Sequence, residues 1–234
     1  MRTVLFFITL CVSSALYSQD INQFDTNGER HGVWRKYFKN TKQVRYEGTF
    51  KHGKEVGEFK FYKLIKKKSV LTATKLFNDK DNSAEVKFLS SKGKVISEGK
   101  MVGKLYVGKW VYYHNKSTKI MTLEHYNNEG KLEGERLVYY KDGVVAERAN
   151  YKNGKREGTL YAYSVKGVVL KEFHYLNDEL EGLVKYFNGK GELLTEGHYK
   201  QGKKTGVWKY YENGKLQKEV NMSYKRKKKS TKKQ

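Results

Sequence analysis

Short runs of alternating bulky and polar residues recur along the chain, separated by turns that contain glycine. In the run VWKYYENGK, residues 207–215, a polar residue separates Trp208 from Tyr210, and Asn213-Gly214 follows. Alternation with a period of two is typical of a β-strand, and Asn-Gly supplies the positive φ angles of a tight hairpin turn. Segments of 5 to 8 residues between turns are also too short for ordinary helices. The pattern therefore predicts antiparallel hairpins.

The runs repeat with a period near 24 residues. We call the residue that precedes each bulky run, usually glycine, the anchor of a unit, and successive anchors lie 24 to 27 residues apart. The anchors are Gly32, Gly57, Ala84, Gly108, Gly134, Gly158, Gly182 and Gly206. With two strands per unit, we predict an all-β fold: an elongated antiparallel meander of about eight stacked hairpins, forming a single twisted sheet of about sixteen strands.

Within the units, corresponding positions carry similar residues. The residues two after the anchor are Trp34, Phe59, Val86, Trp110, Arg136, Leu160, Val184 and Trp208. Arg136 is the exception, and Leu137 beside it predicts a local slip or bulge in the fifth unit. In the second unit, residues 66–68 are all lysine, which predicts a longer, protruding hairpin.

The pattern G-x-W-x-x-Y, N-G-K, E-G-x-Y, N-G-K-x-x-G resembles the MORN repeat variant, found in bacterial proteins of the YwqK-type antitoxin-like family. The matching residues are Glu196, Gly197, Tyr199, Gly202, Gly206, Trp208, Tyr211, Gly214 and Glu219, and the resemblance covers residues 29–224. It implies an elongated sheet of stacked hairpins with an aromatic groove, no catalytic residues, and roles in protein assembly or at acidic phospholipids. Ala84 and Leu89 depart from the pattern, so we expect an irregular sheet in the third unit.

The N-terminus has the features of a secretory signal peptide at residues 1–19. Arg2 precedes an apolar run at 4–12 that is too short to span a bilayer. Residues 20–28 form a lead-in to the repeats. Cys11 is the only cysteine, so a processed chain would contain no disulfide. We expect export to the periplasm, the outer envelope or the medium.

The formal net charge is +23, and a basic tail at residues 225–234 carries part of it. The basic residues of the tail are Lys225, Arg226, Lys227, Lys228, Lys229, Lys232 and Lys233. This charge favours anionic lipid or polysaccharide as a partner of a flexible tail, with a solvated surface as the alternative. Since we expect export, nucleic acid is not a predicted partner.

No catalytic, cofactor-binding or metal-binding residues are predicted. The six histidines, including His31 and His52, show no metal-ligand spacing. Two sets of glutamates recur at fixed positions in several units. Glu133, Glu157 and Glu181 precede anchors, and Glu47, Glu98, Glu172, Glu196 and Glu219 lie in the second half of their units. We expect them to pair with lysines across strands or to satisfy turn amides.

The aromatic rows have a structural and a functional interpretation. They pack across strands, or they form a binding face with candidates Trp34, Trp110, Tyr112, Tyr186, Trp208 and Tyr210. A single sheet does not bury both faces, so curling, a second copy or a ligand must cover the aromatic one. The leading hypothesis is a non-enzymatic, exported scaffold at the bacterial envelope that binds a protein or itself. The alternatives are an antitoxin-like protein and an anionic lipid or glycan binder.

Overall fold

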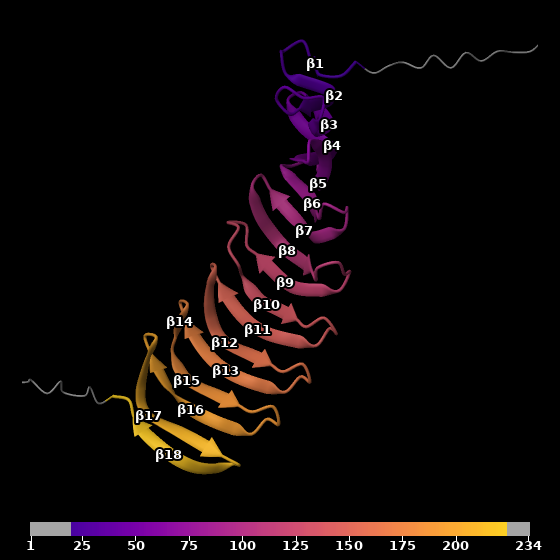
Figure 1. The fold of residues 1–234 in the computed structure, drawn as a ribbon. Helices are drawn as coiled ribbons and strands as arrows, with labels where there is room; N and C mark the ends of the chain where they lie inside the picture. Colours follow the sequence, from indigo (N-terminus) through magenta and orange to yellow (C-terminus); the bar gives the residue numbers. More distant parts are fainter. Residues whose placement is uncertain (1–19, 224–234) are drawn as a thin grey trace, which may run out of the picture.

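The computed structural model describes residues 20–223 (Figure 1). The predicted signal peptide and basic tail lie outside this range. The described residues form one open, all-antiparallel sheet of 18 strands, which confirms the predicted fold class. Within them, no helix is long and apolar enough to cross a membrane.

The strands follow one another in chain order. They are β1 (Gln23–Phe24), β2 (Arg30–Tyr37), β3 (Val44–Lys51), β4 (Lys54–Ile65), β5 (Lys68–Phe77), β6 (Ser83–Leu89), β7 (Val95–Val102), β8 (Leu105–Tyr113), β9 (Ile120–Tyr126), β10 (Gly134–Tyr139), β11 (Val145–Lys152), β12 (Lys155–Tyr163), β13 (Val169–Leu176), β14 (Glu179–Leu180), β15 (Gly182–Phe187), β16 (Leu193–Lys200), β17 (Lys203–Glu212) and β18 (Lys215–Asn221).

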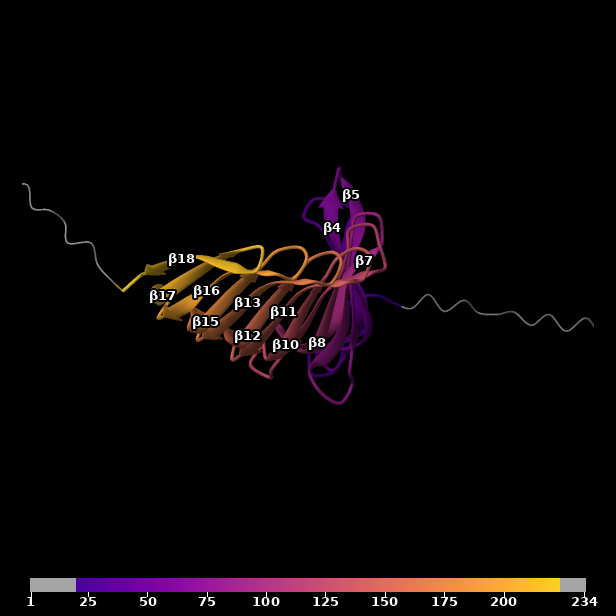
Figure 2. The same ribbon diagram turned by 90° about the horizontal axis from the view of Figure 1, so that it is seen from below.

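Neighbouring strands pair as a meander from one end of the sheet to the other, and β13 pairs with both β14 and β15. The two strands beyond the predicted sixteen are β1, in the lead-in, and β14, which is separated from β15 by Glu181. Figures 1 and 2 show the sheet twisting along its length, so the N-terminal strands run at a large angle to the C-terminal ones.

The second unit contains the longest hairpin, as predicted. β4 has 12 residues and β5 has 10, and the turn between them is formed by Lys66 and Lys67, with φ of 48° and 62°. This hairpin extends beyond its neighbours in Figure 2.

Most anchor glycines lie within strands, at bulges, whereas Gly134 and Gly182 are the first residues of β10 and β15. Gly108, for example, has φ of +64°, and the β7–β8 register shifts there, from Gly99↔Trp110 to Lys100↔Val107. An L-residue disfavours such a φ. Ala84 occupies the anchor of the third unit, and the β5–β6 register runs past it without a shift. The expected irregularity in the third unit is therefore wrong: without glycine, this strand pair is regular.

One row of residues on one face forms the centre of the core, and buried residues such as Phe50 and Met101 flank it. We call this row the central row; it consists of the residues two after each anchor and their partners on the second strands. In order across the sheet it is Trp34, Gly48, Phe59, Lys75, Val86, Gly99, Trp110, Glu124, Arg136, Ala149, Leu160, Phe173, Val184, Gly197, Trp208 and Val220. Phe59, Val86, Trp110, Val184 and Trp208 are almost completely buried.

Residue sizes in the central row are complementary between successive units. Glycine lies under an aromatic ring of the next unit at Gly48, Gly99 and Gly197. A Cβ added to Gly99 would lie 2.5 Å from Cδ2 of Trp110. Elsewhere Ala149 pairs with Leu160. Because large side chains fill the notches left by small ones, a single curled layer buries its own core.

Candidate functional site

Two of the six candidate binding aromatics are core residues. Trp110 and Trp208 have no exposed surface. Tyr106 stacks on Trp110 with ring centroids 3.8 Å apart, and the Lys204 ammonium lies 3.9 Å from the Trp208 ring centroid. In both cases the residue that covers the indole lies four positions before the tryptophan in the same strand, on the other side of the bulge at the anchor glycine. These two indoles therefore serve packing and leave no open face for stacking a ligand.

The other four candidates are half-buried. Trp34 lies against Phe24 of β1, and its Nε1 donates a hydrogen bond to the Gln23 carbonyl at 3.0 Å. Tyr112, Tyr186 and Tyr210 lie four residues after their anchors and keep part of their rings accessible. Curling thus covers much of the aromatic face, and these three tyrosines remain partly accessible on it.

The glutamates before the anchors bind turn amides, as predicted. Each accepts a hydrogen bond from a backbone N–H in the turn that closes its own unit. The pairs are Glu133 with Asn153 at 2.8 Å, Glu157 with Asn177 at 3.3 Å and Glu181 with Gln201 at 2.8 Å. These contacts close one edge of the sheet.

The second set of glutamates pairs across strands, also as predicted. Cross-strand ion pairs join Arg35 to Glu47 (2.9 Å), Lys87 to Glu98 (3.8 Å) and Lys185 to Glu172 (3.9 Å). Three glutamates of the set, Glu47, Glu98 and Glu196, also accept a hydrogen bond from the tyrosine five after the next anchor. Tyr62 donates to Glu47 at 2.7 Å, Tyr211 donates to Glu196 at 2.8 Å, and Tyr113 donates to Glu98. The Tyr62 hydroxyl in turn holds the pKa of Glu47 below its usual range.

The fifth unit replaces the aromatic-over-glycine contact with an ion pair. Arg136 keeps its place in the central row, so the predicted slip is wrong. The bulge in this strand lies between Val138 and Tyr139, the position at which other units also have one. Its Nε lies 2.9 Å from Oε1 of Glu124, and its Nη1 lies 3.0 Å from Oε1 of Glu147. The Tyr126 hydroxyl donates to Glu124 at 2.7 Å, and burial followed by its polar neighbours raises the pKa of Tyr126. A charged network therefore completes this part of the core.

One long edge of the sheet is strongly basic. We call it the lysine edge; it comprises the turns that join the two strands within each unit, together with the strand residue on either side of each turn. Its lysines are Lys39, Lys42, Lys66, Lys67, Lys68, Lys92, Lys94, Lys116, Lys119, Lys141, Lys166, Lys190 and Lys215, all exposed. Three acids lie at the same turns as these thirteen lysines, whereas the turns of the opposite edge, which include Asp25 and Glu29, hold about as many acids as lysines. Every unit contributes at least one lysine, so the charge runs the length of the sheet.

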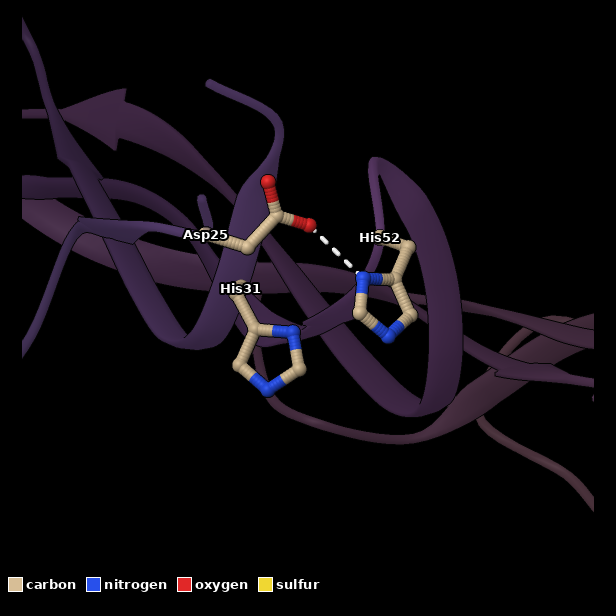
Figure 3. A group of neighbouring side chains, drawn as sticks. All are labelled: Asp25, His31 and His52. Atoms are coloured by element: carbon tan, nitrogen blue, oxygen red, sulfur yellow. Dashed lines mark hydrogen bonds and ion pairs between the residues drawn. The ribbon is translucent and has the colours of Figure 1, made fainter. Parts of the chain in front are cut away.

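A histidine–carboxylate cluster lies at the N-terminal end of the sheet (Figure 3). The cluster consists of Asp25, His31 and His52. Each offers one atom that could bind a metal ion, and these three atoms all lie within 4.8 Å of one another. No other such group of three occurs among residues 20–223. Nδ1 of His52 lies 2.7 Å from Oδ2 of Asp25. The Glu29 backbone N–H, followed by His52, lowers the pKa of Asp25.

Linear spacing did not predict this cluster, because the repeat brings its residues together from different turns. His31 directly precedes an anchor, and His52 begins the turn that closes the same unit. These two positions correspond to Glu133 and Asn153, which touch in the fifth unit. Comparing equivalent positions between units would have placed the two histidines side by side.

Segments 132–153, 180–201 and 204–224 match the family model described as MORN repeat variant. The chain carries MORN repeat variants at these three places. The matched segments lie in the fifth, seventh and eighth units, and the remaining units share the hairpin arrangement of these MORN repeats. No curated protein matches the chain.

Among solved structures, one similar chain is a mutant of S. aureus TarM in complex with Fondaparinux, alpha-GlcNAc-glycerol and UDP. The identity is 13% and the TM-score is 0.21, over 60% of this chain and 21% of that chain. The aligned part of this protein thus corresponds to about a fifth of that chain, and a similarity at this TM-score says nothing about function.

Proposed function

We propose that this protein is a non-enzymatic, exported scaffold of the bacterial envelope that binds an acidic protein partner along its lysine edge. MORN repeats are consistent with a protein-binding or membrane-associated repeat protein. The lysine edge is the observation that carries the proposal, because it distinguishes one long edge of an otherwise repetitive sheet.

The lysine edge suits an extended partner. Successive turns on one edge are separated by two strands, so their lysines recur about every 10 Å. Such a row attracts an acidic surface over a long distance and is weakened by salt. The twist in Figures 1 and 2 keeps the row out of a single plane, which favours a partner that follows a curve over a flat bilayer.

The recurring carboxylates support a role without catalysis. Glu133, Glu157 and Glu181 bind turn amides, and Glu47 and Glu98 bind tyrosines and cross-strand cations. A residue used in this way in several units serves the fold, whereas an active site requires a single asymmetric constellation. This use of the carboxylates supports a binding role along the repeat.

The test is affinity capture by the full-length protein, exported from its native host and carrying a removable tag. The edge variant changes Lys92, Lys119, Lys141 and Lys166 to Gln. The control variant changes Lys104, Lys152, Lys155 and Lys200, exposed lysines of the opposite edge, to Gln. Each lost surface contact contributes about 0.2–1 kcal/mol, so the edge variant should capture roughly tenfold less partner.

The control variant should retain the partner, and raising the salt concentration should release it from the unmodified protein. If both variants captured equally little partner, binding would depend on the overall charge of the protein and not on the lysine edge. Capture of anionic polysaccharide or lipid in place of protein would support the envelope-binding alternative, and a stoichiometric toxin would support the antitoxin-like one. A protein retained in the cytoplasm would contradict export.

A further inference from the structure

We propose that His31, His52 and Asp25 form a binding site for a divalent transition-metal ion such as Zn²⁺. Two imidazoles and one carboxylate are ligands that such ions commonly take, and a fourth position would remain for water or a partner. Their potential ligand atoms lie within 4.8 Å of one another, and Figure 3 shows the three side chains gathered between the lead-in and the first unit.

The cluster departs from the repeat at both histidine positions. In the fifth, sixth and seventh units, the residue before the anchor is a glutamate that accepts the N–H of the closing turn. In the first unit the same two positions hold His31 and His52, whose rings lie 5.0 Å apart between centroids. The first unit thus places two imidazoles where these three units place a glutamate and a turn amide, and no other unit has histidine at both positions.

Asp25 is held in place by its own turn. Its Oδ1 accepts the backbone N–H groups of Asn27 and Glu29, both at 2.9 Å, while Oδ2 faces His52. Fixed ligands lower the entropic cost of binding an ion. The Glu29 side chain lies beside Gly53, next to His52, and adds a second negative charge near the cluster.

The ion would join the lead-in to the first unit at the N-terminal end of the sheet. Asp25 lies in the lead-in after β1, His31 lies in β2 and His52 lies in the β3–β4 turn. β1 contributes only two residues to the ladder, and Phe24 is 62% exposed. An ion bound to the folded state alone stabilises it, so it would fasten this short terminal strand to the first unit.

The experiment measures Zn²⁺ binding to the full-length, tag-free protein by calorimetry after chelator treatment, with Co²⁺ absorption reporting the coordination. We expect one ion per chain. His31→Ala and His52→Ala should each weaken binding about tenfold or more, a change of at least ~1.4 kcal/mol. The control is His198→Ala, an exposed histidine in the seventh unit. Zn²⁺ should also slow amide exchange in β1 and β2.

Circular dichroism establishes that each variant is folded, and His31→Gln and His52→Gln replace any alanine variant that is not. Absence of saturable Zn²⁺ binding would overturn the proposal. So would binding that the His31 and His52 substitutions leave unchanged, or binding that His198→Ala removes. Unchanged amide exchange in β1 and β2 would overturn the stabilising role of the ion.

Discussion

The indole ring of Trp208 lies directly over Gly197 on the neighbouring strand, where any larger residue would overlap the ring. Trp110 over Gly99 and Phe59 over Gly48 repeat this relationship. The sheet has one layer, so its core depends on how well each unit fits the unit before it. Stability should therefore respond to residue size at these glycines.

Gly197→Ala should destabilise the protein by about 1–3 kcal/mol, because the added methyl overpacks a buried site. Gly189→Ala is the matched control, since a Cβ at that glycine meets nothing within 4 Å. Denaturant unfolding of both variants measures the difference. Equal stability of the two would contradict the packing account.

Adding Trp208→Leu to Gly197→Ala should recover part of the loss. The double variant recreates the pair formed by Leu160 and Ala149 in another unit. A double-mutant cycle from the same unfolding experiments gives the coupling between the two sites. Simple additivity would show that the two residues do not interact.

At the anchor position, replacing glycine by alanine in one unit and alanine by glycine in another should both lower the stability of the protein. Gly206 has φ of +62° with open space around it, so Gly206→Ala should cost about 1 kcal/mol through the backbone alone. Ala84 lies in a regular strand, and Ala84→Gly should cost about 0.5–1 kcal/mol. Thermal unfolding of both variants provides the comparison, and stabilisation by either change would refute the assignment.

The sequence was sufficient to predict the hairpins, the meander and the roles of the repeated glutamates, because period-two alternation and turn residues are local signals. The bulges at anchors such as Gly108 were not predicted, because glycine is favoured both in turns and at bulges within strands and the pattern does not distinguish the two. Arg136 was taken for a slip, although its partner Glu124 lies on the preceding strand of another unit. The residue pattern within one unit does not predict contacts such as this one, which are made between units.

Arg136→Leu should destabilise the protein by about 2–3 kcal/mol, because it leaves the largely buried Glu124 carboxylate without its cation. Adding Glu124→Ala should restore much of the stability, since leucine over alanine is the pairing of Leu160 and Ala149. Denaturant unfolding measures both variants. A double variant less stable than Arg136→Leu alone would contradict the view that the ion pair takes the place of a large apolar side chain packed over a small one.

Stability should fall as the pH rises from about 10 to about 12. Burial, then Glu47, raises the pKa of Tyr62 from 10.0 to about 12, and Glu98, then burial, does the same for Tyr113. The folded state therefore keeps protons that the unfolded state has already lost, and this stabilisation disappears as the pH approaches the folded pKa. Unfolding free energies measured across this range should decline.

The double variant Tyr62→Phe/Tyr113→Phe should show a shallower decline in the same range. Tyr37→Phe is the control: Tyr37 holds the same repeat position, but in the first unit no earlier unit supplies a glutamate. An equal slope in the double variant and the unmodified protein would contradict the prediction.

The two candidate recognition surfaces were not equally predictable. Aromatic residues stand out in the sequence, yet the structure buries Trp110 and Trp208 completely. The lysine edge emerges only when alternate turns are assigned to opposite edges, which requires the strand order. His31 and His52 likewise meet only once the repeat has folded.

The most direct test of the account compares the lysine edge with the accessible tyrosines in a single capture assay. One variant changes Lys92, Lys119, Lys141 and Lys166 to Gln, and the other changes Tyr186 and Tyr210 to Thr, with folding checked by circular dichroism. We predict that the lysine variant loses the partner and the tyrosine variant retains it. Loss in the tyrosine variant with full capture by the lysine variant would contradict recognition at the lysine edge.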